Sequence, residues 1–288
     1  MLLQKNIDKY KLTVKQAIDE LFDMAFTNQK FENDLVLILA NGTKNNYPEE
    51  TLKRLKITNY QIGHDYVHFR YTTFFDFFIQ FKRLRDEEEY KEIQDKQLYN
   101  ETMIQMQLLA YMKFWETDLI LKRLYNLTRL LEGKEFSWDI SQKELNERRR
   151  LVKDEIQNPV NSLCPQFFML IEDVYSRQLR NAIAHSQYYI MYDTITLTNK
   201  DENKYYKLNG FSFERWEEIF TKVILMHNYM IDNFNRYHSF YVNKANVKHN
   251  GLLIYFPEIQ INGLRRSGWI KWDEPRKLWY WNDKGVKI

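Results

Sequence analysis

Cysteine, glycine and proline are scarce in this sequence, and each shortage narrows the range of folds. Among 288 residues there are one cysteine (Cys164), eight glycines and five prolines. A single cysteine excludes an intramolecular disulfide and a cysteine-rich zinc site. Because helix breakers are rare and 44% of the residues are hydrophobic, we expect long helices packed around an apolar core.

The sequence also lacks a long apolar run and a strong net charge. No uncharged stretch reaches the roughly 18 residues of a membrane-spanning helix, and the opening residues MLLQKNIDKYK do not resemble a signal peptide. We therefore expect a soluble cytoplasmic protein that makes no membrane contact. The net charge of +3 excludes a histone-like polycation and says little else about partners.

Aromatic residues are abundant, at 16% of the chain, and apolar residues recur at helical spacing in several segments. Capping residues and breakers set the ends of these segments. The first expected helix begins at Thr13. Further helices are expected over 66–96, over 101–131 with Gly133 as the C-cap, from Ser141 to about Pro159, over 166–185, and from Ser212 to about Met230. The helix over 101–131 is expected to be the longest.

Two segments favour strands instead. Residues 189–208 alternate weakly around a turn at 199–203, which predicts a β-hairpin. From about Asn243, glycine and proline cut the chain into short pieces typical of strands. The fold class is therefore mostly α: an antiparallel helical bundle with a small β-hairpin insertion and a small β-type C-terminal appendage. The expected regions are a helical N-terminal region (1–95), a helical domain (96–242) and the appendage (243–288).

The hexapeptide RNAIAH brings together Arg180, Asn181 and His185. Arginine offers a planar set of donors for a phosphate, and histidine exchanges a proton near neutral pH. On one continuous helix, the buried line through Ile171 and Val174 would run on to Asn181 and His185. We therefore expect a cleft or an interface there, with the amide of Asn181 orienting the imidazole of His185. The alternative is structural, with Arg180 in a surface ion pair and His185 at the helix end.

These residues resemble the HEPN superfamily, whose catalytic members carry R-x4-6-H with a polar residue often following the arginine. The resemblance covers about residues 96–242. It implies a HEPN-like helical bundle and a homodimer in which the motif helices face each other across a composite cleft. It also implies a metal-independent endoribonuclease, with no cofactor, that acts on RNA such as tRNA in bacterial abortive infection or as a toxin. In one branch, R-x4-H-x-Y, an antitoxin modifies the tyrosine; this chain has Gln187 at that position and Tyr188 next.

Metal-free cleavage of RNA needs the chemistry that this motif offers. The 2′-hydroxyl attacks its own phosphate and leaves a 2′,3′-cyclic phosphate and a 5′-hydroxyl. The enzyme must relieve charge on the phosphorane, a role for Arg180, and move two protons, a role for His185. One imidazole does not readily serve as base and acid in the same step, so a two-fold dimer is part of the hypothesis.

Three further patterns compete with the motif. His64 and His68 stand four residues apart, but capping or packing explains them better than a metal site. Glu89 and Lys91 form the E-x-K pattern of metal nucleases, but they lie in a charged helical run that favours a solvated surface. The C-terminal appendage combines four tryptophans with basic residues, so it can bind RNA or pack as a hairpin on the helical body. Its candidate RNA-binding residues are Arg265, Arg266, Lys271, Trp272, Arg276 and Lys277.

Two other functions remain open at this point. One is a non-catalytic HEPN-like module for dimerisation or interaction, in which the motif has a structural role. The other is an RNA binder that does not cleave. Under each hypothesis, an antitoxin or another defence-system protein is a candidate partner.

Overall fold

A computed structural model describes residues 4–44, 48, 50–51, 59–63, 96–140, 150–199, 209–259 and 263–282. These residues are mostly helical and carry three small antiparallel sheets. The chain divides into two compact units. As far as they are described, Met1–Ile18, Val67–Leu121 and Pro165–Tyr229 form the first unit, and Asp19–Tyr66, Lys122–Cys164 and Met230–Ile288 form the second. No helix among the described residues is long and apolar enough to span a membrane.

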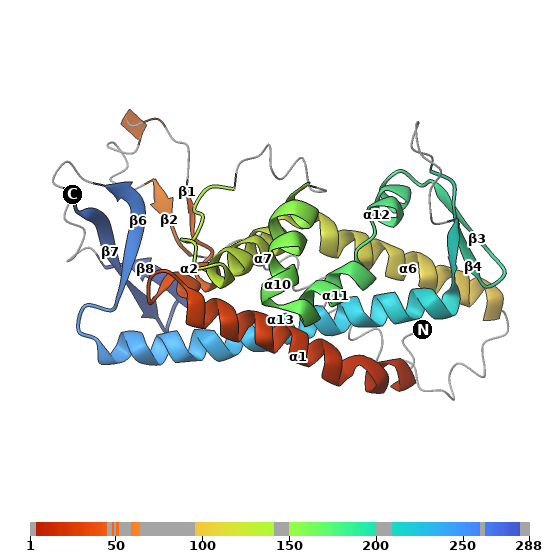
Figure 1. The fold of residues 1–288 in the computed structure, drawn as a ribbon, viewed down its shortest axis with the longest axis horizontal. Helices are drawn as coiled ribbons and strands as arrows, with labels where there is room; N and C mark the ends of the chain where they lie inside the picture. The colour runs from red at the N-terminus through yellow and green to blue at the C-terminus, as the bar shows by residue number, and fades with distance from the viewer. Residues whose placement is uncertain are drawn as a thin grey trace. The chain divides into compact units, whose positions relative to one another are not determined.

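The first unit carries the motif. Its helices include the first part of α1 (Gln4–Asn28), α6 (Lys96–Glu116), α11 (Pro165–Val174), α12 (Arg177–Ala184) and the first part of α13 (Phe213–Val247). Its sheet has the strand order β3 (Tyr188–Met191), β4 (Thr194–Leu197) and β5 (Gly210–Ser212). In Figure 1 this sheet lies beside α6, on the same side as α12. The core contains the fully buried rings of Tyr111, Trp115, Phe167 and Trp216.

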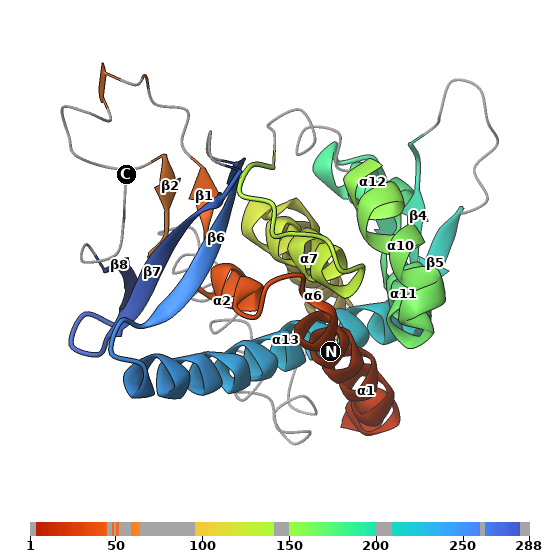
Figure 2. The ribbon, with the colours of Figure 1, turned by 60° about the vertical axis from the view of Figure 1, so that its left-hand side comes forward.

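The second unit holds the C-terminal sheet, with the order β6 (Leu252–Ile259), β7 (Arg265–Asp273) and β8 (Leu278–Trp281). Its other elements are the rest of α1, α2 (Asp34–Leu39), α7 (Asp118–Leu131), a π-helix (Leu151–Gln157), α10 (Asn158–Leu163), the rest of α13, and the short pair β1 (Thr43–Lys44) and β2 (Tyr60–Gln61). Figure 2 shows β6, β7 and β8 together, with β1 and β2 next to them. The prediction of strands near the C-terminus is confirmed.

The first helix, α1 (Gln4–Asn28), begins well before the expected start at Thr13. Thr13 is exposed within the helix, where it caps nothing. Val14, Ile18 and Leu21 are buried at helical spacing, and no glycine or proline precedes them. A capping-type residue therefore fails to start the helix here, because the upstream residues 4–12 contain no helix breaker and include several good helix formers (Gln, Lys and Leu).

The expected helix over 101–131 is two helices, because the chain breaks at Thr117. The carbonyl oxygen of Thr117 accepts from the amides of Ile120 (3.1 Å) and Leu121 (3.2 Å), as an N-terminal helix residue does. At the far end, Gly133 adopts φ +73° and the Lys134 amide donates to the Arg129 carbonyl at 2.9 Å. This left-handed C-terminal cap confirms the predicted role of Gly133.

The longest helix described is α13, which has 35 residues. The Ser212 hydroxyl accepts from the Arg215 amide at 3.2 Å, so the predicted cap is confirmed. The helix runs on to Val247, past the expected end near Met230 and past the expected change to strands at Asn243.

Pro159 does not end a helix either. It lies in the first turn of α10, where the lack of a backbone N–H in proline is tolerated. The π-helix Leu151–Gln157 leads directly into this turn. The helix expected over 66–96 falls almost wholly outside the described residues, and the start expected at Ser141 falls outside them too.

The expected hairpin is a three-stranded sheet. Strands β4 and β5 flank the predicted turn at 199–203, of which only Asn199 is described. A second, tighter turn joins β3 to β4 at Tyr192–Asp193, where Tyr192 adopts φ +55°. The sequence offers no glycine or asparagine at this turn, so the usual signal for a two-residue hairpin is missing.

Candidate functional site

The motif lies on α12, which is a helix separate from α11. Ser176 sits between them in an extended conformation, with φ −125° and ψ 114°, and its hydroxyl accepts from the Leu179 amide at 3.2 Å. The expectation of one helix over 166–185 is therefore wrong. The hydroxyl of a serine at the N-cap accepts a hydrogen bond from a backbone amide at the start of a helix. Ser176 therefore favours the start of a new helix over the continuation of α11.

The break is fixed by a buried side chain from α6. The Tyr111 hydroxyl donates to the Val174 carbonyl at 3.0 Å and accepts from the Ser176 amide at 3.0 Å. Tyr111 is fully buried, and burial raises the pKa of its phenol. The last carbonyl of α11 and the amide of the capping residue are thus both satisfied within the core. The polar line expected to continue from Ile171 and Val174 does not exist as one helical face.

Arg180 extends toward α6. Its Nε lies 3.2 Å from Oε1 of Glu116, and its Nη2 donates to Oδ1 of Asn181 at 2.8 Å. The side chain is only 13% exposed. Within the described part of the chain, Nε and Nη1 are buried without an aligned hydrogen bond, so the contact with Glu116 is an ion pair at close range. The guanidinium is held in one orientation between α12 and α6.

His185 is the C-cap of α12. Its amide donates to the Asn181 carbonyl at 3.0 Å, Ser186 adopts φ +54°, and the Gln187 amide donates to the Ala182 carbonyl at 2.7 Å. This geometry ends the helix and leaves the imidazole of His185 exposed. The amide oxygen of Asn181 accepts from Arg180. No hydrogen bond joins the Asn181 side chain to the imidazole of His185 among the described residues, so the predicted orienting contact is not seen.

Tyr188, one residue beyond the tyrosine position of the R-x4-H-x-Y branch, packs on α6. Its hydroxyl donates to Oε1 of Gln105 at 2.9 Å, and burial raises the pKa of its phenol. Gln187, at the branch position itself, is exposed.

In the second unit, the candidate RNA-binding residues are divided between packing and solvent. Arg265 makes two hydrogen bonds with the Glu135 carboxylate, at 2.6 and 2.9 Å, and lies over the ring of Phe31. Arg266 lies over the ring of Phe256. These two guanidiniums are therefore used in packing.

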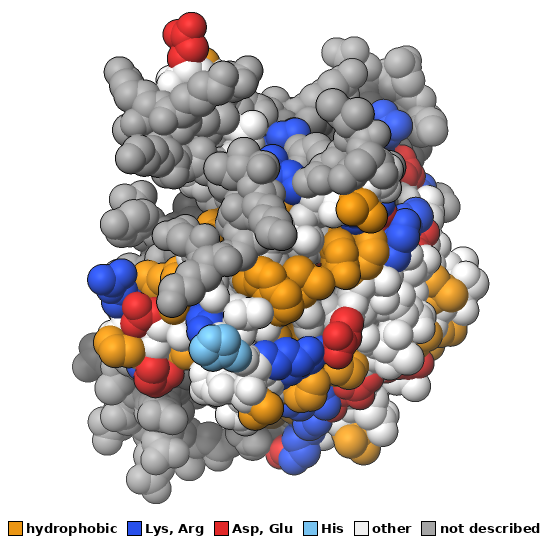
Figure 3. Space-filling view, turned by 90° about the vertical axis from the view of Figure 1, so that its left-hand side faces the viewer, with side chains coloured by type: hydrophobic (Ala, Val, Ile, Leu, Met, Phe, Trp, Pro, Cys, Tyr) orange, Lys and Arg blue, Asp and Glu red, His pale blue; other side chains and the backbone are white. Residues whose placement is uncertain are grey.

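The remaining candidates lie on β7 and on its turn into β8. Trp272 donates to Glu274 at 2.6 Å and Lys277 pairs with the same carboxylate, while Lys271 is half-buried. Arg276 is 77% exposed. On the face in Figure 3, the described Lys and Arg side chains are interspersed with Asp and Glu and form no single basic patch.

Two C-terminal tryptophans pack the sheet into its own unit. Trp279 is 2% exposed. Trp281 donates from Nε1 to the Tyr60 carbonyl at 3.1 Å, and its ring lies near those of Trp138 and Phe256. These rings serve the core and offer little surface for stacking bases.

Sequence reasoning missed Glu116 and Tyr111, which position the motif, because neither shows a local pattern. It also missed a hollow of about 500 Å³ in the second unit. The hollow is lined in part by Lys30, Lys44, Tyr60, Arg129, Lys134 and Trp138. Among the described residues, no three or more His, Cys, Asp or Glu side chains gather as metal ligands would. The pair His64 and His68 and the pair Glu89 and Lys91 lie outside those residues.

Comparison with known proteins assigns no family, since no family model, curated protein or solved structure matches this chain.

Proposed function

We propose that the end of α12 is the active site of a metal-independent endoribonuclease that works as a homodimer. The observation that carries the proposal is an exposed imidazole, His185, that follows a positioned guanidinium, Arg180, on the same short helix. An exposed imidazole can reach a bound polymer and exchange protons with it. A guanidinium fixed by Glu116 and Asn181 loses little side-chain entropy when a phosphate arrives.

In this proposal the 2′-hydroxyl of one nucleotide attacks the adjacent phosphorus. The bond from phosphorus to O2′ forms as the bond from phosphorus to O5′ breaks. Arg180 stabilises the charge of the phosphorane, and His185 in its protonated form donates to the departing 5′-oxygen. A second group must accept the 2′-hydroxyl proton, and the second copy in the dimer is its source. The products are a 2′,3′-cyclic phosphate and a 5′-hydroxyl. The HEPN-like role in abortive infection or toxicity belongs to this same proposal.

One observation favours a different function. Arg180 is only 13% exposed and pairs with Glu116, which is what a structural ion pair between α12 and α6 requires. The second candidate is therefore a non-catalytic interaction module in which the motif holds α12 in place.

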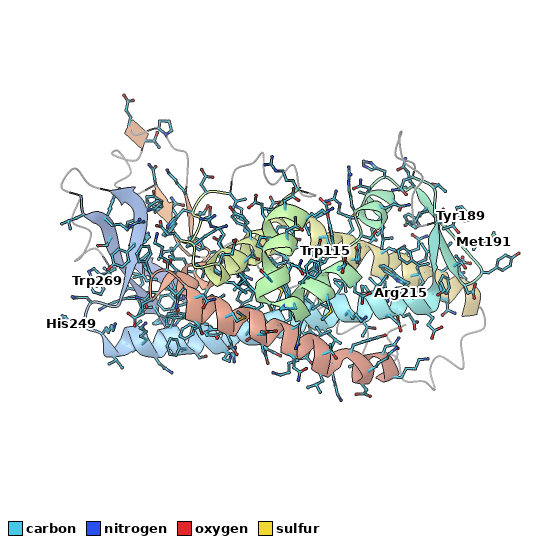
Figure 4. The ribbon with its side chains drawn as sticks, in the orientation of Figure 1. Trp115, Tyr189, Met191, Arg215, His249 and Trp269 are labelled. Carbon is cyan, nitrogen blue, oxygen red and sulfur yellow. The ribbon has the colours of Figure 1, made fainter. Side chains whose placement is uncertain are left out.

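The two candidates are separated by assaying total tRNA and a single-stranded RNA in excess EDTA, with the product ends identified. The variants are His185→Ala and Arg180→Ala, and the control is His249→Ala, an exposed histidine of the second unit (Figure 4). The ribonuclease proposal expects 2′,3′-cyclic ends from wild type and His249→Ala, and none from His185→Ala with its fold intact. No cleavage by folded wild type, together with a large stability loss in Arg180→Ala alone, supports the interaction module.

A further inference from the structure

Strand β3 has an open edge. In the sheet order β3–β4–β5 it pairs with β4 on one side, and no described strand pairs with its other side. The Thr198 amide donates to the Gln187 carbonyl at 2.9 Å, which identifies that pair as hydrogen-bonded. Hydrogen-bonded pairs alternate along an antiparallel ladder. Tyr189 therefore bonds to β4, whereas Tyr188 and Ile190 direct their backbone N–H and C=O groups to the open edge.

Among the described residues, β3 lacks the charge, the proline and the bulge that often protect an edge strand. Native edge strands are commonly interrupted by lysine, proline or a bulge, whereas β3 reads Tyr-Tyr-Ile-Met and pairs regularly with β4. On its outer face, Tyr189 is 47% and Met191 is 52% exposed. Figure 4 shows both side chains at the outer side of the hairpin. An uncharged edge with an apolar outer face is suited to adding another strand.

We propose that β3 pairs with β3 of a second copy of this chain, antiparallel, about a two-fold axis at Tyr189. In this register Tyr188 exchanges hydrogen bonds with the partner's Ile190, and Ile190 with the partner's Tyr188. All four outward N–H and C=O groups of each strand are then used. The three-stranded sheet becomes one of six strands, and the two-fold axis closes the assembly.

The choice of a second copy rests on the proposed function, which requires another proton-transfer group. The edge geometry supplies one. His185 precedes Tyr189 by four residues and Asp193 follows it by four. The N-terminal end of β3 is the end nearest to His185. The antiparallel register therefore brings this end alongside the partner's Tyr192–Asp193 turn. The two imidazoles lie on opposite sides of the axis, unlike the facing motif helices that the HEPN resemblance implies. The group that joins each His185 is therefore the partner's Asp193. Its carboxylate accepts the 2′-hydroxyl proton while the imidazolium donates to the 5′-oxygen.

The pairing involves a strand of only four residues, so we expect it to bury less than the roughly 1,200 Å² of a standard stable interface. The dimer is therefore expected to depend on concentration and to dissociate on dilution, which sedimentation velocity of the full chain measures directly.

Disulfide trapping tests the register. At the axis, Tyr189 and the partner's Tyr189 form a pair without hydrogen bonds, with Cα atoms about 4.5 Å apart, which is within disulfide range. Mild oxidation of Tyr189→Cys should therefore yield covalent dimers. The matched control Ile190→Cys should not, because Ile190 lies opposite the partner's Tyr188. The native Cys164 is buried and does not interfere. A wild type that stays monomeric, or Ile190→Cys linking as well as Tyr189→Cys, overturns the interface.

Mixing inactive variants tests the shared site. His185→Ala and Asp193→Asn should each be inactive alone. When they are mixed, about half of the dimers are mixed and each has one intact site, so cleavage should return to about a quarter of the wild-type rate. Trapping without any wild-type cleavage contradicts the ribonuclease and leaves the interface standing. Cleavage without trapping contradicts the interface alone. Trapping and cleavage without rescue contradict the role of Asp193.

Discussion

Replacing Tyr111 with phenylalanine tests whether one buried hydroxyl fixes the position of α12. Phenylalanine keeps the ring packed at 5.5 Å from Trp216 and removes only the hydroxyl. The Val174 carbonyl and the Ser176 amide then each lose a partner at 3.0 Å. An ordinary hydrogen bond contributes about 0.5–1.5 kcal/mol, and a buried group left unpaired costs about 1–3 kcal/mol. Val174 is 1% exposed whereas Ser176 is partly open to water, so we expect a loss of about 2–3 kcal/mol.

The measurement is urea unfolding followed by circular dichroism, with hydrogen exchange of the α12 amides as the local readout. Tyr188→Phe is the matched control, because its hydroxyl bonds to a side chain near the surface and should contribute less than about 1 kcal/mol. Tyr111→Phe should also speed exchange in α12 more than in α1. Equal losses in the two variants, with unchanged protection of α12, would refute the reasoning.

Three further outcomes follow from single positions. Gly251 adopts φ +89° and an added Cβ would lie 2.2 Å from a carbonyl oxygen of β7, so Gly251→Ala should lower the free energy of unfolding by more than about 3 kcal/mol. The control is Gly263→Ala, where φ is +76° and the space around the residue is open, and it should lower the free energy of unfolding by about 1 kcal/mol. Burial raises the pKa of Asp34 to about 7. The protonated carboxyl therefore contributes fully to stability below about pH 4, and this contribution is lost as the pH rises to about 7. Relative to wild type, Asp34→Asn should gain stability over that window, as measured by urea titrations at pH 5 and 8. Glu116→Gln removes the charge that competes with phosphate for Arg180, so the KM for RNA cleavage should fall about fivefold, the equivalent of about 1 kcal/mol. An unchanged KM would argue against a phosphate at Arg180.

Helix ends could be predicted from the sequence where the signal is local. Gly133 and Ser212 were identified correctly because a left-handed C-cap and an N-cap hydroxyl depend on a few neighbouring residues. Thr13 was not, because capping residues also occur on exposed helical surfaces. The breaks at Thr117 and Ser176 escaped prediction for a different reason. Apolar periodicity continues across both, and at Ser176 the decisive partner is Tyr111, which is distant in the sequence.

The candidate site was predictable in composition and not in geometry. The motif supplied Arg180, Asn181 and His185, but the contact with Glu116 depends on how α12 packs against α6. Likewise, Arg265 and Arg276 contribute equally to a count of basic residues. The structure gives Arg265 a carboxylate partner at 2.6 Å and leaves Arg276 77% exposed. A basic composition is therefore a weak guide to a binding surface when acids alternate with it.

The break before α12 determines how the motif can act. Had residues 166–185 formed one helix, the packing of α11 would have fixed the direction of every motif side chain. Because Ser176 restarts the helix and Tyr111 fixes the restart, α12 is positioned by its own contacts with α6, of which the ion pair between Arg180 and Glu116 is the closest to the motif. Arg180 thereby serves both stability and the proposed chemistry, whereas the side chain of His185, exposed past the last turn, makes no comparable contact with the described residues. Loss of cleavage in His185→Ala is consequently the cleaner evidence for catalysis, and loss in Arg180→Ala is informative only when α12 keeps its protection from hydrogen exchange.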